Sequence, residues 1–283
     1  MSAAMAVSLH RRRLVVGLSL AFVGSPAWAA VDRPTAEALL RISGLWAQLA
    51  DVASQARADA LGGLNQRGAA STQAEVERLS QAIASAYSAQ RLRSACLDAT
   101  SKNLEKAHVA ALRRWYEGSP GSAIVRLEVA HSAQDPRVVL EQGAAMLARM
   151  PSSRRRVLEE VVVATRAAEL QTELAINTSL ALGQGARAAR DPTAPSVGEL
   201  QATLAAQRHQ IMRAAGAQSL VAFASTYSSL RDADLDTYVN FLKSPAGRHF
   251  VDVAIHALGA AIFGAALDFG RALGGARGPA RGT

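Results

Sequence analysis

Cysteine and aromatic residues are scarce in this chain of 283 residues, which has one cysteine and 5% aromatic residues. A single thiol cannot close an internal disulfide, so we expect Cys96 to be a small buried hydrophobic residue in a helix. An intermolecular disulfide or a nucleophile is the alternative. Runs of β-branched residues are also rare, whereas alanine, leucine, arginine, glutamate and glutamine are abundant. This composition favours helix almost everywhere, so the sequence predicts an all-α protein.

The sequence also lacks the motifs of several enzyme classes. It has no Gly-x-Ser-x-Gly nucleophile elbow, no Ser-x-x-Lys with its partner motifs and no glycine-rich phosphate loop. No catalytic residue is assigned and no cofactor is predicted, so the sequence leans against an enzyme. The net charge is +8, but there is no pattern of basic and aromatic residues, so we expect no nucleic acid partner. A basic surface suits anionic envelope components, or it reflects a generally arginine-rich composition.

The N-terminus has the features of a secretory signal peptide. A basic stretch, His10–Arg13, precedes an apolar run over Leu14–Val23, and Ala27-Trp28-Ala29 has the small-x-small pattern that a signal peptidase recognises. The apolar run is too short to span a bilayer, which takes about 20 residues. We therefore predict a signal peptide over 1–29 and a periplasmic or secreted protein. The pair Arg11-Arg12 leaves open whether export uses the general or the twin-arginine route.

Apolar periodicity and start signals divide the rest of the chain into amphipathic helices. Pro34-Thr35 marks the start of the first helix, which Gly62-Gly63 should end. Ser196 and Glu199 form a capping box at the start of a later helix. We expect further helices over 72–87, 106–117, 120–131, 136–150, 151–182, 196–228, 232–243 and 245–273, with a loop over 183–195 and a disordered tail over 274–283.

An internal repeat relates the two halves of the chain at an offset of 126 residues. Each copy is a short helix with an aromatic residue in its last turn, then a Ser-Pro pair and a glycine at the start of the next helix. The paired residues are Trp115 with Phe241 and Gly121 with Gly247, whereas Ser119-Pro120 and Ser244-Pro245 are displaced by one residue. We therefore predict an irregular bundle built from two similar four-helix halves, 30–150 and 151–273.

The second copy resembles a known family. The segment 230–247, and above all Ser244-Pro245-Ala246-Gly247, is similar to a bacterial domain of unknown function that occurs in many exported proteins. Leu242 stands where that family has a tyrosine, and 115–121 resembles a degenerate copy with a shifted Ser-Pro pair. The resemblance implies a periplasmic helical protein and brings no established activity and no site residues.

One group of residues has spacing compatible with metal binding. His249, Asp252 and His256 are spaced i, i+3 and i+7, which places them on one face of a helix. The alternative is a hydrogen bond between Asp252 and His256 within the helix.

The C-terminal helix is apolar over 250–269 and approaches the length of a membrane span, but Asp252, His256 and Asp268 interrupt it. We expect it to be buried in the core or in an oligomer interface. The sequence thus favours a non-enzymatic binding or envelope-interaction module, whose partner is an envelope protein, a lipid or a small ligand. The alternatives are a membrane- or lipid-associated module that uses the C-terminal helix and, third, a metal-binding protein or hydrolase. An interaction module should have an apolar groove between the halves, and the oligomeric state stays open.

Overall fold

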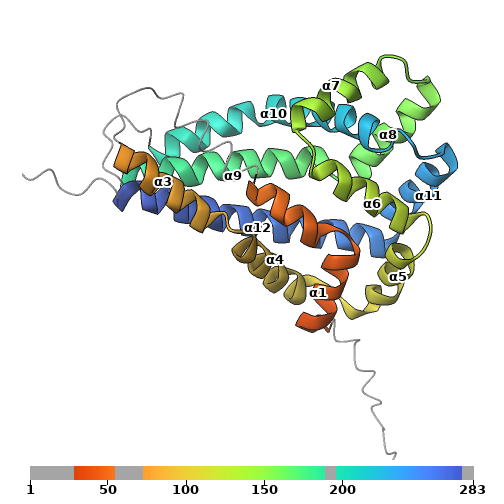
Figure 1. Ribbon diagram of the computed structural model, residues 1–283, viewed down its shortest axis with the longest axis horizontal. Helices are drawn as coiled ribbons and strands as arrows, with labels where there is room; N and C mark the ends of the chain where they lie inside the picture. Colours follow the sequence, from red (N-terminus) through yellow and green to blue (C-terminus); the bar gives the residue numbers. More distant parts are fainter. Residues whose placement is uncertain (1–28, 55–72, 189–195, 276–283) are drawn as a thin grey trace, which may run out of the picture.

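The three longest helices, α9 (Ala167–Ala188), α10 (Val197–Thr226) and α12 (Pro245–Gly275), run along the length of the molecule (Figure 1). The computed structural model describes residues 29–54, 73–188 and 196–275, so the predicted signal peptide up to residue 28 lies outside the described residues. Within these ranges, the regular structure is helical apart from one isolated bridge between Ala30 and Glu105. The predicted all-α class is confirmed.

The first predicted helix is interrupted at Gly44. Asp32 caps α1 (Arg33–Ile42) by accepting the Thr35 N–H at 2.7 Å, and a second helix follows over 45–54. Gly44 has φ of +80°, and a Cβ there would lie 3.0 Å from Val125 Cγ1 and 2.8 Å from Val129 Cγ2. Only glycine meets both demands without strain, so the chain turns here and the expected continuous helix is wrong.

A second predicted helix is also divided. The expected helix over 151–182 consists of α8 (Ser152–Ala164) and α9, separated at Thr165 and Arg166. Arg166 has φ of +52°, and its guanidinium donates to Glu169 and to Asp252 of α12, so contacts across the turn hold this conformation. α9 then continues to Ala188, so the predicted loop over 183–195 is helical in its first part.

The remaining boundaries follow local signals more closely. The capping box at Ser196 and Glu199 is present, with both of its hydrogen bonds. The N-terminal part of the predicted tail at 274–283 is helical, because α12 extends to Gly275. The other helices are α3 (Gln73–Ala86), α4 (Ala89–Asn103), α5 (Lys106–Glu117), α6 (Gly121–Ser132), α7 (Pro136–Leu147) and α11 (Asp232–Lys243).

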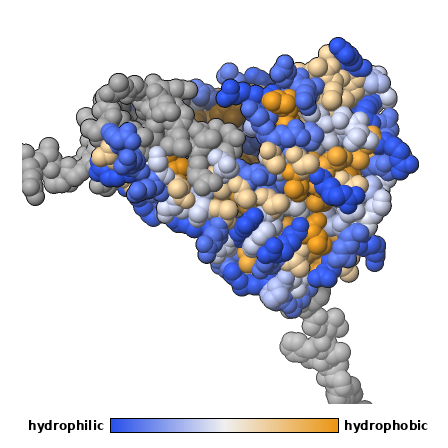
Figure 2. All heavy atoms as spheres, viewed as in Figure 1, coloured by the Kyte–Doolittle hydropathy of each residue, from blue (hydrophilic) through white to orange (hydrophobic). Residues whose placement is uncertain are grey.

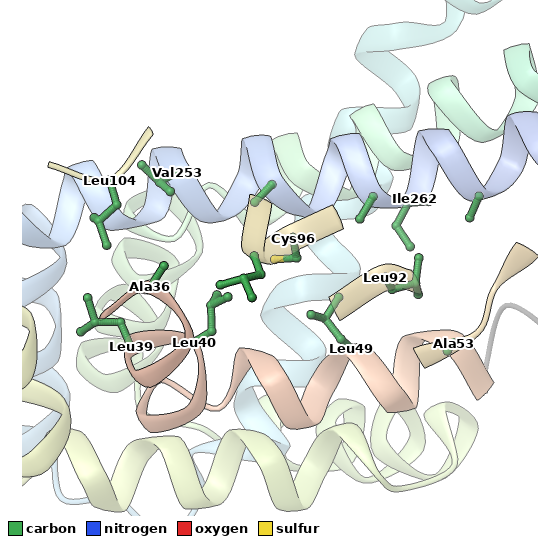
Figure 3. Packing of buried hydrophobic residues seen from close by; sticks show 14 of the residues in the cluster. Ala36, Leu39, Leu40, Leu49, Ala53, Leu92, Cys96, Leu104, Val253 and Ile262 are labelled. Carbon is green, nitrogen blue, oxygen red and sulfur yellow. The ribbon is translucent and has the colours of Figure 1, made fainter. Parts of the chain in front are cut away.

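The buried hydrophobic residues form two clusters that do not follow the predicted halves. The first cluster joins α1, the helix over 45–54, α3 and α4 to α12, and it includes Leu40, Cys96 and Val253 (Figure 3). The second cluster joins α8, α10 and α11 to Ile124 of α6. The repeat places α6 and α12 in equivalent positions. α6 nevertheless contributes to the cluster formed mainly by the second half, and α12 contributes to the cluster formed mainly by the first half. The pair of similar halves is not confirmed, and the duplication stays a prediction.

Among the described residues, Pro245–Ala272 is long and apolar enough to cross a membrane, with a mean hydropathy of 1.9. In the folded protein this helix packs against α9, α4, α3, α11 and α5. Ala257 and Ala266 are fully buried, and Phe269 is 5% exposed. Part of its apolar surface is therefore buried in the first cluster, and 39% of the apolar window is buried in all.

Candidate ligand cavity

The two corners, Ser244-Pro245-Ala246-Gly247 and Ser119-Pro120-Gly121, each place two helices in close contact. Between α11 and α12, the Ser244 hydroxyl donates to the Phe241 carbonyl at 2.6 Å and accepts the Gly247 N–H at 3.1 Å. A Cβ on Gly247 would overlap the Phe241 carbonyl oxygen and lie 2.9 Å from Leu242 Cα. This position therefore needs glycine because the backbone of the preceding helix is in the way.

The corner between α5 and α6 has the same close approach. A Cβ on Gly121 would overlap the Trp115 carbonyl oxygen and lie 2.9 Å from an atom of the Trp115 ring. Here the Ser119-Pro120 peptide is cis, and Pro120 at the N-cap of α6 makes no side-chain capping bond. The two corners share the glycine contact and differ in their caps.

The aromatic residues of the two corners pack on one another. The Trp115 and Phe241 rings are stacked, with centroids 4.3 Å apart and planes 6° from parallel. Trp115 also stacks on Tyr238 at 5.9 Å, and Tyr116 contacts Phe241 and Phe250. These residues form one continuous aromatic layer between α5, α11 and α12.

A cavity of about 460 Å³ adjoins this aromatic layer. The first predicted half contributes residues 43–48, α5 and α6 to its walls, and the second half contributes α9, α10, α11 and α12. The cavity therefore lies between the two predicted halves. Most of the lining is apolar, and six aromatic residues contribute to it: Trp115, Tyr116, Phe223, Tyr227, Tyr238 and Phe250. The volume is in the range of small-molecule sites.

Glu128 of α6 brings a carboxylate to this cavity. Its Oε1 accepts hydrogen bonds from the hydroxyls of Tyr227 at 2.6 Å and Tyr238 at 2.9 Å. Burial raises the pKa of Glu128, and the two hydroxyl donors partly oppose this by stabilising the carboxylate. The pKa of Tyr227 and of Tyr238 is raised well above 10, first by burial and then by the charge of Glu128. Glu128 Oε2 has no hydrogen-bond partner among the described residues.

Polar contacts on both sides hold α6 in the cavity wall. His131 Nε2 lies 3.0 Å from the Ser225 hydroxyl of α10, and the Ser132 hydroxyl donates to Asp51 at 2.6 Å. On the face of the molecule drawn in Figure 2, hydrophobic residues gather over α5, α6 and α7, with hydrophilic residues between them.

The structure distributes the three candidate metal ligands among different contacts. Asp252 is exposed and pairs with Arg166, and His256 is exposed. His249 instead lies close to Glu105, the N-cap residue of α5, and to His108 of α5.

Sequence reasoning did not single out Glu128, Glu105 or His108. One local signal was available for Glu128, because it lies four residues after the buried Ile124 and hence on the same, inward face of α6.

Comparisons of the chain with protein-family models, with curated proteins and with solved structures give no match. The resemblance of 230–247 to an exported domain of unknown function therefore stays a prediction.

Proposed function

We propose that this is an exported, non-enzymatic binding protein whose cavity takes a small ligand with an apolar body and a cationic group. The observation that carries the proposal is Glu128, a carboxylate with one unpartnered oxygen inside an aromatic-lined cavity. The apolar walls suit the body of the ligand, and the carboxylate with its aromatic surroundings suits the positive charge.

The chemistry of the site favours a cation over an anion or a neutral group. Aromatic faces attract cations through the ring quadrupole, and Tyr116, Tyr227 and Tyr238 all lie near the charge of Glu128. Two hydroxyls already donate to Oε1, so the site is arranged around an accepting carboxylate. A ligand cation would complete the pairing that the protein itself leaves open.

The raised pKa of Glu128 makes binding dependent on pH. A cation next to the carboxylate favours its ionised form, so binding releases the proton that Glu128 holds below its raised pKa. Affinity for a permanently charged cation should therefore rise with pH through that range.

The segment that follows the predicted cleavage point packs against the helical body. Val31 is 5% exposed and donates its N–H to the Leu104 carbonyl at 3.0 Å, immediately after the predicted cleavage point at Ala29.

Three aromatic probes that differ in the charge of one substituent test the proposal: benzyltrimethylammonium, benzyl alcohol and benzoate. Protein purified from the periplasm of cells that express the full chain is titrated with each, by calorimetry and by tryptophan fluorescence. We expect the cation to bind most tightly. Glu128→Gln, which keeps an oxygen acceptor for the two tyrosines, should weaken its binding by about tenfold or more, the size of one charged contact.

Glu141→Gln is the matched control, because Glu141 is exposed on α7 and does not line the cavity. It should bind the cation as the wild type does. Tighter binding of benzoate or benzyl alcohol, or unchanged binding of the cation by Glu128→Gln, would contradict the proposal.

Membrane association through α12 is the second candidate, supported by the length and apolarity of that helix. It requires α12 to leave its contacts with α9 and α4. Wild-type protein that floats with lipid vesicles, and loses this when Phe263 and Leu267 are made charged, would favour it.

A further inference from the structure

We propose a second, independent site: a divalent transition-metal site of the zinc type formed by Glu105, His108 and His249. The ligand atoms of these three residues lie within 4.8 Å of one another. None of the three lines the cavity that carries the proposed function.

The chain brings these ligands together from two elements. Glu105 is the N-cap residue of α5, and His108 follows one turn later, with its Nε2 3.8 Å from Glu105 Oε2. His249, in the first turns of α12, places its ring centroid 4.7 Å from that of His108. A metal here would join the start of α5 to the start of α12.

The side chains are available for this purpose. The Glu105 carboxylate makes no capping hydrogen bond, although its residue occupies the N-cap of α5. His249 Nε2 accepts the backbone N–H of Glu105 at 3.1 Å, so this nitrogen carries a lone pair and no proton. A metal binds to such an imidazole lone pair, and an ion bound at Nε2 would take the place of the Glu105 N–H hydrogen bond.

The donor set and its spacing fit zinc. Two imidazole nitrogens and one carboxylate oxygen are a common zinc ligand set with a fourth position left for water. Bonds of about 2.1 Å in a tetrahedron place ligand atoms about 3.4 Å apart, so separations of up to 4.8 Å need to close by up to about 1.4 Å. The three side chains are partly exposed, which allows both this adjustment and entry of the ion.

The test uses full-chain protein exported to the periplasm, treated with a chelator and titrated with zinc chloride alone. Calorimetry and metal analysis after dialysis should give one zinc per chain. His108→Ala and His249→Ala should each weaken binding by about tenfold or more, because two ligands rarely hold zinc. Zinc should also raise the melting temperature of the wild type and not that of either variant.

His256→Ala is the control, because this histidine is on the same helix as His249 but is exposed and outside the cluster. It should retain wild-type zinc binding. Far-UV circular dichroism without metal shows whether each variant is folded, and Glu105→Gln, which removes only the charge, serves if an alanine variant is not. Wild-type protein that holds no zinc, or folded His108→Ala, His249→Ala or Glu105→Gln that holds it as well as the wild type, would overturn the proposal.

Discussion

Replacement of Gly247 by alanine is expected to destabilise the protein, whereas the same change at Gly259 in the same helix is expected to stabilise it. A Cβ on Gly247 would overlap the carbonyl oxygen of Phe241 and lie 2.9 Å from Leu242 Cα, and both obstacles are backbone. Backbone cannot rotate away as a side chain can, so α11 and α12 would have to separate. No atom from elsewhere lies within 4 Å of a Cβ placed on Gly259.

Two opposing contributions set the magnitude. Overpacking costs about 1–3 kcal/mol, and alanine in place of glycine within a helix gains about 1 kcal/mol. The clash at Gly247 is with backbone atoms of two consecutive residues, Phe241 and Leu242, which puts the cost at the upper end of that range, so we expect a net loss of about 2 kcal/mol in the free energy of unfolding. For a chain of this size that lowers the melting temperature by roughly 4–8 °C. Gly259→Ala should gain up to about 1 kcal/mol.

Urea unfolding followed by far-UV circular dichroism measures both effects as shifts of the midpoint at constant slope. Gly121→Ala should shift the midpoint in the same direction as Gly247→Ala, because a Cβ there overlaps the Trp115 carbonyl oxygen. A Gly247→Ala protein as stable as the wild type, or midpoints that move together for Gly247 and Gly259, would refute the reasoning.

Two further predictions concern buried groups. The pKa of Glu128 is raised above 4.5 in the folded protein. At pH values between 4.5 and the raised pKa, the folded state therefore holds a proton that the unfolded chain has released. Its stabilising contribution is thus present at acidic pH and is lost as the pH rises through the raised pKa of Glu128. Urea unfolding at several pH values should show Glu128→Gln gaining on the wild type as the pH rises, and a constant difference would contradict this. Cys96 is fully buried, and burial raises its pKa to about 11. Native protein at pH 8 should therefore resist a disulfide reagent that labels the urea-unfolded chain completely, and rapid labelling of native protein would show that the thiol is accessible.

Local signals in the sequence were sufficient for helices whose ends depend on nearby residues. The expected ranges 106–117 and 232–243 coincide with α5 and α11, since Ser-Pro pairs end both helices within a few residues. The breaks at Gly44 and Arg166 were missed because distant contacts stabilise them. Gly44 packs against Val125 and Val129 of α6, and Arg166 binds Asp252 of α12.

The same distinction separates the predicted and the observed sites. The three metal candidates on one face of α12 were chosen by their spacing within a helix, but Asp252 and His256 are engaged elsewhere or exposed. Each proposed site instead combines residues far apart in the chain. Glu128 meets Tyr227 and Tyr238 from 99 and 110 residues away, and Glu105 meets His249 from 144 residues away. No pattern within one helix contains that information.

The exchange of α6 and α12 between the two hydrophobic clusters explains why the cavity lies where it does. Ile124 of α6 belongs to the cluster formed mainly by the second segment, whereas Phe250 of α12 belongs to the other. α12 packs on α9 of its own half as well as on α3 and α4 of the other half, and α6 contacts both α5 and α10. The stacked Trp115 and Phe241 lie where the two corners meet. The space beside this stack is enclosed by both segments and by neither alone. Glu128 reaches Tyr227 and Tyr238 only because α6 crosses to the second cluster. The cavity is thus a consequence of the way in which the two halves pack together.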